Sequence, residues 1–325
     1  MDDRNDALLK IVLCGTNYGA SYVPAIEGPI FTLAGILARG SERSVKLATR
    51  LDVPLWTSAD DVADDVKLAV VALPPPAAED VATALLARRI HVLIEHPVAA
   101  DVLRELRTHA KRSSVTLNVC SHFPELSAAR AFVQECRRRS EVRRPQYASV
   151  VTAPRLAYAT FDLLGRALGG LNGSSLERES ANVNGPAYPF ESFRGVVNEI
   201  PVRVQCSRTI GAVDDGSDMP VPQRIEVGFE DGNVMLLGPA GPVIWSEKLG
   251  YALLGHPGPL WVNAGAPSGT FADLMKDRVV ANRRTLTEIH EQMLGRKEPP
   301  HQTTEWLVRV AELMNIVRSA QIRVG

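Results

Sequence analysis

Short apolar runs alternate with amphipathic segments through the first third of the chain. Residues 9–14, 31–37, 68–73, 91–94 and 115–119 are rich in aliphatic and β-branched side chains, as expected of strands that are buried on both faces. Between these runs apolar residues recur at helical spacing, for example at Val81, Leu85 and Leu86. Strands that alternate with helices imply right-handed crossovers and a parallel sheet. The pattern therefore predicts an α/β domain over residues 1–121.

The pattern changes after Ser121. Helical stretches come first, around residues 129–136 and 161–168, and strand-like stretches then follow one another at 196–205, 224–229, 234–237 and 243–246. The Glu-Asp-Gly-Asn sequence at 230–233 predicts a hairpin turn, and residues 211–223 read as a long surface loop. Two helices, about 270–295 and 303–321, close the chain. Consecutive strands without crossovers predict an α+β domain with a mainly antiparallel sheet over residues 122–325.

The first predicted strand ends in the sequence GTNYGA at 15–20, directly before a helix. A dinucleotide site needs a tight turn there, a close approach of the backbone to the pyrophosphate and a helix N-terminus directed at it. Asn17 replaces the second glycine of the usual GxGxxG motif, and asparagine tolerates left-handed backbone better than most residues. The segment predicts a Rossmann domain, with an ordinary glycine turn as the alternative. The residues expected at the cofactor are Gly15, Thr16, Asn17, Tyr18 and Gly19.

The residues after the second strand bear on the choice of cofactor. NAD enzymes place an acid there for the ribose 2′-hydroxyl, whereas a 2′-phosphate needs cations and hydroxyls. The sequence ARGSERS at 38–44 has no acid at the strand end and offers Arg39, Ser41 and Arg43. Arginine suits bidentate phosphate contacts. The segment therefore favours NADPH, although a solvated helix start would have a similar composition.

The ends of the third and fourth strands are also expected to face the cofactor, because ligands of open α/β sheets bind beyond the carboxyl ends of the strands. The residues concerned are Leu73, Pro74, Glu95 and His96. The unperturbed pKa of a histidine, about 6.5, makes His96 a candidate proton donor near neutral pH. A structural histidine in a turn is the alternative. Pro97 restricts the backbone of His96 and permits a cis peptide bond.

These motifs together resemble the Gfo/Idh/MocA oxidoreductase superfamily. The resemblance rests on GTNYG after the first strand, ALPPP after the third and HVLIEHPV at the fourth. Most members have Glu-Lys-Pro where this chain has Glu95-His96-Pro97, and that lysine is their acid/base. They also carry an Asp and a His four residues apart in the second domain. No Asp stands four residues before His122, His256, His290 or His301, so both departures count against a sugar dehydrogenase.

One branch of the superfamily fits these departures. CGTNYG, LAGILARGSERS, EHPV and FDLLGRALGGL are similar to the thiazolinyl imine reductases of yersiniabactin- and pyochelin-type siderophore biosynthesis. This resemblance, which extends to about residue 175, implies NADP(H)-dependent reduction of a thiazoline to a thiazolidine on the carrier domain of a nonribosomal peptide synthetase. It also implies a homodimer formed through the second sheet. The alternatives are a reductase of another small imine or carbonyl compound and a cofactor-binding regulator without catalysis.

The resemblance also bears on the proton donor. A tyrosine near the end of the fifth strand is a second candidate acid in that branch, and here Phe123, beside His122, takes its place. His96 is therefore the expected donor, with His122 as the alternative. Hydride addition to C=N leaves negative charge on nitrogen, and a positioned donor typically accelerates such a step by about 10²–10⁴-fold. The candidates for an apolar substrate cleft, or equally for plain core, are Tyr158, Phe190, Trp245 and Trp261.

Composition excludes other functions. The formal net charge of −1 gives no global attraction to nucleic acid or membranes, and the arginines at 137–139, 143 and 144 form either a solvated helix end or a docking site for an acidic carrier domain. The acidic start is unlike a signal peptide, and no apolar run reaches the roughly 20 residues of a membrane span. The cysteines form no CxxC pair, so we expect a cytoplasmic protein with reduced thiols and no metal site. They are Cys14, Cys120, Cys136 and Cys206.

Overall fold

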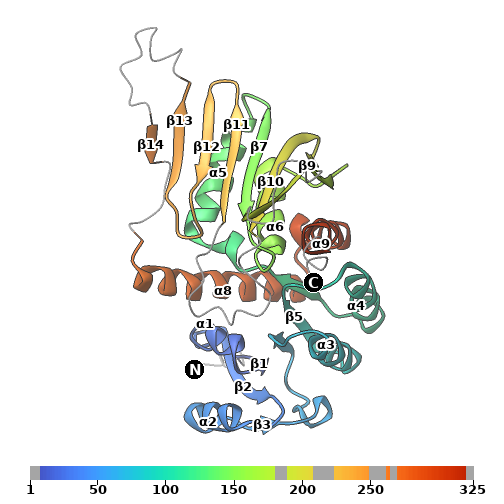
Figure 1. The fold of residues 1–325 in the computed structure, drawn as a ribbon. Helices are drawn as coiled ribbons and strands as arrows, with labels where there is room; N and C mark the ends of the chain where they lie inside the picture. The colour runs from blue at the N-terminus through green and yellow to red at the C-terminus, as the bar shows by residue number, and fades with distance from the viewer. Residues whose placement is uncertain (1–7, 180–188, 208–222, 249–260, 264–268, 320–325) are drawn as a thin grey trace. The chain divides into compact units, whose positions relative to one another are not determined.

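The computed structural model describes residues 8–179, 189–207, 223–248, 261–263 and 269–319. The chain divides into two compact units, one built from residues 1–120 and 279–307 and the other from 121–278 and 308–325 (Figure 1). The sequence placed the boundary after residue 121 and assigned everything beyond it to the second domain. The structure instead groups 279–307 with the first unit, because an amphipathic helix there packs on the first sheet.

The first unit contains a six-stranded sheet in the order β3-β2-β1-β4-β5-β6, and every neighbouring pair is parallel. This arrangement confirms the predicted Rossmann domain. The expected strand over 68–73 stops before the proline run, and the two-residue β3 was not predicted. The strands are β1 (Leu9–Cys14), β2 (Phe31–Leu37), β3 (Leu55–Trp56), β4 (Leu68–Val71), β5 (His91–Glu95) and β6 (Leu117–Cys120).

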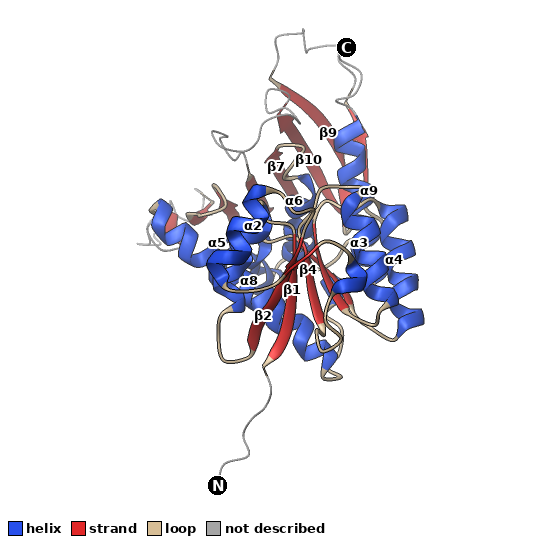
Figure 2. Cartoon of the chain, turned by 90° about the horizontal axis from the view of Figure 1, so that it is seen from below, coloured by secondary structure: helices blue, strands red, loops and turns tan. Residues whose placement is uncertain are grey.

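Helices cover this sheet because each presents an apolar stripe to it. Leu286 and Ile289 of α8 pack with Ile11, Leu13 and Val70 in a fully buried cluster. Figure 2 shows α3 and α4 side by side next to the strands. The helical elements described here are the 3-10 helix η1 (Tyr18–Tyr22), α1 (Val23–Ile26), α2 (Glu42–Leu51), α3 (Ala77–Ala87), α4 (Ala100–Ser113) and α8 (Phe271–Met293).

The backbone groups at the outer edge of β6 form hydrogen bonds with side chains instead of with another strand. Gln302, in the 3-10 helix η4 (Pro300–Gln302), accepts a hydrogen bond from the Val119 N–H and donates one to the Val119 carbonyl, both at 3.0 Å. Arg107 of α4 donates to the Leu117 carbonyl and pairs with Glu298. Because buried backbone groups need partners, these contacts satisfy an edge that would otherwise be unpaired.

The second unit contains an eight-stranded sheet in the order β14-β13-β12-β11-β7-β10-β9-β8. The pair β7–β10 is parallel and the other pairs are antiparallel, so the prediction of a mainly antiparallel sheet is confirmed. The strands are β7 (Tyr147–Thr152), β8 (Ser175–Arg178), β9 (Phe190–Val197), β10 (Ile200–Ser207), β11 (Arg224–Phe229), β12 (Gly232–Leu236), β13 (Val243–Glu247) and β14 (Trp261–Asn263).

Strands β8 and β14 and residues 190–195 of β9 were not predicted, and two further details also differ. The stretch 196–205 is not one strand, because Asn198 and Glu199 both have positive φ, 49° and 65°, and turn the chain between β9 and β10. Positive φ at both central residues is the requirement of a type I′ hairpin turn. Strand β7, in the middle of the sheet, was not predicted. The hairpin at 230–233 is confirmed between β11 and β12.

Helices α5 (Ser127–Ser140) and α6 (Ala157–Leu168) lie against one face of the second sheet (Figure 1). Val150, Val204 and Val227 are fully buried on that face. Helix α9 (Thr304–Ser319) ends the described chain, and the predicted loop 211–223 lies, up to residue 222, outside the described residues. Within the described ranges, none of the helices combines the length and apolar character that crossing a membrane requires.

Candidate functional site

The first βα turn lies where β1, β2 and β4 end together. Gly15 has a φ of +95°, and a Cβ at this position would lie 2.5 Å from the Ala72 carbonyl oxygen. Its N–H donates to the Leu37 carbonyl at 3.1 Å. Only glycine fits this backbone without strain. The predicted residues beyond it, Thr16, Asn17 and Tyr18, are partly or fully exposed, so the turn is accessible to a ligand.

The element after this turn is helical, as predicted, but most of it is not α-helix. Residues Tyr18–Tyr22 form a 3-10 helix, and α1 then runs only from Val23 to Ile26. Gly19 is buried, and a Cβ there would lie 3.2 Å from Leu13 Cδ1, so it packs against the first strand. The predicted phosphate contact would therefore depend on the turn and the side chains around it, since the α-helix that follows has only four residues.

The predicted 2′-phosphate residues surround the end of β2. Arg39, Ser41 and Arg43 are exposed, and Ser41 caps α2 by accepting from the Ser44 N–H at 3.3 Å. Arg43 Nη1 donates to Asn17 Oδ1 at 3.1 Å, which joins this segment to the first turn. Two guanidinium groups and a hydroxyl are the side chains that the predicted 2′-phosphate contact would use.

The acid in this segment does not occupy the place that an NAD-type acid would. Glu42 lies on the exposed face of α2 and pairs with Lys46 at 2.5 Å. The chemistry at the end of β2 is therefore cationic.

The end of β5 carries the Glu95-His96-Pro97 sequence. Glu95 is only 9% exposed, and its carboxylate accepts a hydrogen bond from the Tyr22 hydroxyl. Burial, together with the nearby Cys120 and Glu95, raises the pKa of Tyr22 well above its usual value, so the hydroxyl stays a donor. This contact connects η1 to the end of β5, and no sequence pattern predicts it because the partners lie 73 residues apart.

His96 is partly buried, and its backbone N–H donates to the Cys120 carbonyl at 3.1 Å. The peptide bond between His96 and Pro97 is cis. Of the two residues expected after β4, Leu73 is partly buried and Pro74 is exposed. The first unit therefore brings the predicted residues to the carboxyl ends of β1, β2, β4 and β5.

His122 has an unusual backbone in the second unit. Its φ and ψ are 57° and −60°, and the Phe123 N–H donates across it to the Ser121 carbonyl at 2.6 Å. This geometry is a γ-turn with positive φ, which is rare and strained for a residue with a side chain. The imidazole is 3% exposed and meets the Phe123 ring edge-on, with centroids 5.5 Å apart.

The predicted substrate residues are found in different surroundings. Tyr158, in α6, is 1% exposed, and Trp245, in β13, is 8% exposed, with the Arg139 guanidinium 3.0 Å above its ring centroid. Phe190 is partly buried at the start of β9. Trp261 lies in β14, and its side chain is outside the described set.

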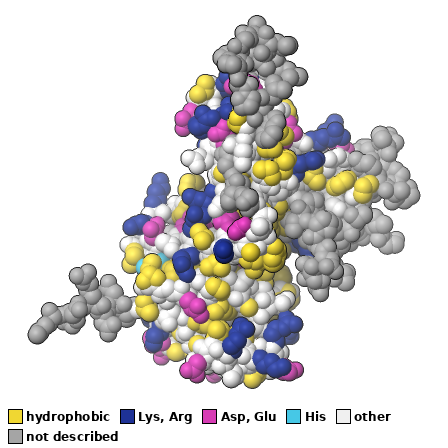
Figure 3. Space-filling model, turned by 90° about the vertical axis from the view of Figure 1, so that its left-hand side faces the viewer, with side chains coloured by type: hydrophobic (Ala, Val, Ile, Leu, Met, Phe, Trp, Pro, Cys, Tyr) yellow, Lys and Arg dark blue, Asp and Glu magenta, His cyan; other side chains and the backbone are white. Residues whose placement is uncertain are grey.

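The arginine cluster at 137–144 is largely paired with carboxylates of the same unit. Arg138 and Arg139 both bond to Glu135, and Arg143 bonds to Glu230. On the face drawn in Figure 3, basic and acidic side chains are interspersed among hydrophobic ones. A carrier domain that docked on these arginines would have to compete with acids that are already in place.

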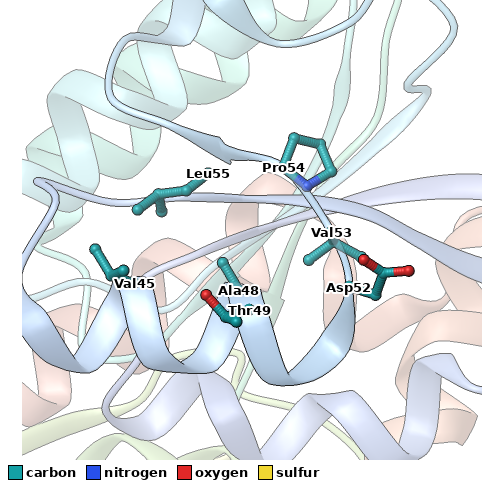
Figure 4. Close-up of a pocket in the computed structure, with 7 residues that line it drawn as sticks. All are labelled: Val45, Ala48, Thr49, Asp52, Val53, Pro54 and Leu55. Atoms are coloured by element: carbon teal, nitrogen blue, oxygen red, sulfur yellow. The ribbon is translucent and has the colours of Figure 1, made fainter.

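The groove in Figure 4 lies elsewhere on the first unit. It has a volume of about 560 Å³ and lies between α2 and the segment that leads into β3, including Val45, Thr49 and Pro54. None of the predicted cofactor residues lines it. Among the described residues, no three His, Cys, Asp or Glu side chains are arranged to hold a metal ion. None of the four cysteines, all of which are buried, forms a disulfide bond, and burial raises the pKa of the Cys206 thiol to about 12.

Two family models match the chain in separate regions. Residues 9–121 match the oxidoreductase family with an NAD-binding Rossmann fold, designated GFO_IDH_MocA. Residues 143–246 match the C-terminal region of the Irp3-like thiazolinyl imine reductases. No curated protein matches the chain at a significant level.

Solved structures share the fold along almost the whole chain. An oxidoreductase from Agrobacterium radiobacter, in complex with NAD+, L-tartaric acid and magnesium, has a TM-score of 0.72 at 11% identity, over 98% of this chain and 97% of that chain. GenD2 from gentamicin A biosynthesis, in complex with NAD, has a TM-score of 0.71 at 15% identity, over 98% and 95%. UDP-N-acetylglucosamine 3-dehydrogenase GnnA from Acidithiobacillus ferrooxidans has 0.69 at 14%, over 96% and 97%. At these identities the likeness establishes the fold.

Proposed function

We propose a reaction for this chain on the premise that it belongs to the Gfo/Idh/MocA oxidoreductase family and carries an Irp3-like C-terminal domain. The reaction is the NADPH-dependent reduction of a thiazoline C=N bond to a thiazolidine, on a siderophore intermediate tethered to a carrier domain of a nonribosomal peptide synthetase. The observation that carries the proposal is the match of residues 143–246 to thiazolinyl imine reductases. His96, at the position where most of the family carries lysine, supports it.

The cofactor would be held by the first turn and the end of β2. Arg39, Ser41 and Arg43 would bind the 2′-phosphate, and Arg43 is already held toward the turn by Asn17. Gly15 lets the backbone turn tightly, and the exposed residues after it would contact the pyrophosphate. Bound NADPH supplies a hydride to the thiazoline carbon. The preference for NADPH over NADH rests on the cationic donor set, since charge-assisted contacts to phosphate are strong.

The proton for the thiazoline nitrogen would come from His96. The C=N bond gains a hydride on carbon and a proton on nitrogen, so the product contains a C–H and an N–H bond, and solvent returns a proton to the imidazole. The Glu95 contact with Tyr22 fixes the backbone just before His96, which holds the donor in place. His122 is the second candidate donor, on the strained turn of the second unit.

Two partners belong to this proposal. One is the carrier domain that would present the thiazoline. Of the residues predicted for an apolar cleft, Tyr158 and Trp245 are core residues, and Phe190, at the start of β9, is only partly buried and would contact the substrate. The other is a second copy of the chain, meeting the first through the second sheet. A groove of about 640 Å³ runs over β7, β8, β9 and β10 on that sheet, and light scattering of the purified protein measures whether two copies associate.

The test is turnover of a hydroxyphenyl-thiazoline thioester or its carrier-bound form. Loss of NADPH absorbance, with a gain of two hydrogens in the product by mass spectrometry, is expected with the thiazoline and absent with hexoses or inositol. A sugar site would need polar groups matched to hydroxyls, because each buried polar group left unpaired costs about 1–3 kcal/mol. Turnover of a polyol without reaction on any thiazoline would overturn the proposal. Tight NADPH binding without turnover of any imine or carbonyl compound would indicate a regulator.

A further inference from the structure

A cluster of buried charges holds both ends of the turn that contains His122. The Ser121 hydroxyl donates to the Asp162 carboxylate, and Arg166 donates to the same carboxylate through Nε at 3.1 Å and Nη2 at 2.9 Å. The Nη1 of Arg166 donates to Glu125. One guanidinium thereby links two carboxylates, and through them the residues on either side of His122.

The charges in this cluster are largely withdrawn from water. The side chains of Asp162, Arg166 and Glu125 are 6%, 14% and 13% exposed. Burial alone would lower the pKa of Arg166, but the charges of Asp162 and Glu125 outweigh it and hold that pKa above its usual value. The guanidinium therefore stays charged and keeps both carboxylates in place.

The cluster holds the residues on either side of His122, whose backbone conformation is strained. The positive φ of His122 places the residue in a sparsely populated region, and such residues persist only when the surrounding structure over-determines them. Here the Phe123 N–H bonds to the Ser121 carbonyl, and the Glu125 N–H bonds to the His122 carbonyl at 3.1 Å. The side-chain contacts of Ser121 and Glu125 anchor the same short segment to α6.

Stability by itself does not account for three buried charges. Removing an ion pair from water carries a large desolvation cost, so a well-packed apolar group is often as stabilising as a buried salt bridge. An ion-pair network does what an apolar patch does not: its directional hydrogen bonds specify one geometry. In helix α6 Asp162 and Arg166 stand four residues apart, and four-residue spacing puts two side chains on the same face.

We propose that Asp162, Arg166 and Glu125 are positioning residues, which hold residues 121–125 so that the His122 imidazole keeps one place and orientation during catalysis. This inference rests on the proposed reduction and assigns it a further set of residues. It also gives a role to the segment FDLLGR at 161–166, whose charged members both belong to the cluster.

The test is a double-mutant cycle in the full-length protein. Arg166→Lys should lower kcat by about tenfold while KM and NADPH affinity stay within twofold, because a single ammonium cannot make the forked contacts of a guanidinium. Arg107→Lys is the matched control, because Arg107 is also 14% exposed and also pairs with a carboxylate. The kcat of this variant should stay within twofold of the wild-type value. In a His122→Ala background, Arg166→Lys should cause no further loss, since residues that act as a unit are non-additive. Losses that multiply would overturn the inference.

A second measurement works without turnover. In protein with ¹³C-labelled histidine, the His122 ring signal is assigned by its absence in His122→Gln. Arg166→Lys and Glu125→Gln should shift or broaden that signal and leave the remaining histidines unchanged, whereas Arg107→Lys should leave it in place. If no thiazoline is reduced, the proposed function fails and the spectrum still decides the inference. An unmoved His122 signal overturns it, and Glu125→Gln gives the same reading if Arg166→Lys does not fold.

Discussion

The backbone at His122 predicts an inverted order of stability between two substitutions. His122→Ala and His122→Gly both remove the imidazole and its edge contact with Phe123. They differ in the Cβ, which is strained at a φ of 57° and a ψ of −60°. We therefore expect the glycine variant to be the more stable of the two, although glycine is ordinarily the weaker residue in folded elements.

The magnitude follows from two opposing costs. A residue with a side chain held in a sparsely populated backbone region costs about 1–3 kcal/mol. Glycine loses more conformational freedom on folding than alanine, at about 0.5–1 kcal/mol. The difference leaves His122→Gly more stable than His122→Ala by about 1 kcal/mol. For a cooperative unit of about 150–250 residues, 1 kcal/mol corresponds to about 2–4 °C in Tm.

The assay is thermal unfolding of both variants by circular dichroism in one buffer. Lys46, which pairs with Glu42 on the exposed face of α2, provides the control pair. Lys46→Gly should melt below Lys46→Ala by a similar margin, because glycine lowers the stability of a helix interior by about 1 kcal/mol. The reasoning is refuted if His122→Gly melts at or below His122→Ala while the Lys46 pair behaves as expected.

Three further predictions concern the cofactor, the proton donor and the sheet edge. Arg39→Ala or Arg43→Ala should lower the affinity for NADPH at least tenfold in titration calorimetry and barely change the affinity for NADH, since a charge-assisted contact contributes about 1.5–3 kcal/mol. An equal loss of affinity for both cofactors would contradict this prediction. His96→Ala should keep NADPH affinity and lose one to three orders of magnitude in kcat; an unchanged kcat under chemistry-limited conditions would show a structural histidine. Gln302→Leu should destabilise the fold by at least 2 kcal/mol in urea unfolding, because both backbone groups of Val119 lose partners worth about 1–3 kcal/mol each; a loss below 1 kcal/mol would show that the edge finds other partners.

The strands of the first sheet were predictable because parallel strands covered on both faces are continuous apolar runs. The strand predicted over 68–73 is two residues too long. Ala72 and Leu73 are apolar, but they lie beyond Val71, the last residue that pairs with β1. The two-residue β3 has no pattern long enough to detect. Strand boundaries depend on hydrogen bonds between strands, and these cannot be predicted from the composition of one strand alone.

The second sheet was harder to read because its strands alternate and its turns are short. Residues 196–205 look like one strand with polar interruptions, yet Asn198 and Glu199 adopt the left-handed backbone of a two-residue turn. Asparagine at the first turn position was an available signal, since it is favoured in type I′ turns. Strand β7 alternates buried residues with less buried ones and follows an arginine-rich stretch closely, which obscures its alternation.

In the candidate site, too, some features could be predicted from the sequence and others could not. The tight turn at Gly15 could be predicted, because the backbone requirement of a βα turn is local to one short segment; the phosphate-binding role of Arg39 stays a prediction. The contacts of Arg43 with Asn17 and of Tyr22 with Glu95 could not, because hydrogen bonds between distant segments leave no period in the sequence. Those contacts decide how the predicted residues are held.

The contact between Asp162 and Arg166, by contrast, can be detected in the sequence of α6. An Asp and an Arg four residues apart in a helix ordinarily indicate an exposed pair worth about 0.2–0.5 kcal/mol. The helix around Asp162 and Arg166, however, is apolar on all sides, and all of its remaining residues are buried. A helix that is hydrophobic all round is a buried helix, and charged side chains are almost never buried without partners. A charged pair in such a helix therefore implies a further polar group outside it, and here Ser121 and Glu125 supply that group on the turn that carries His122.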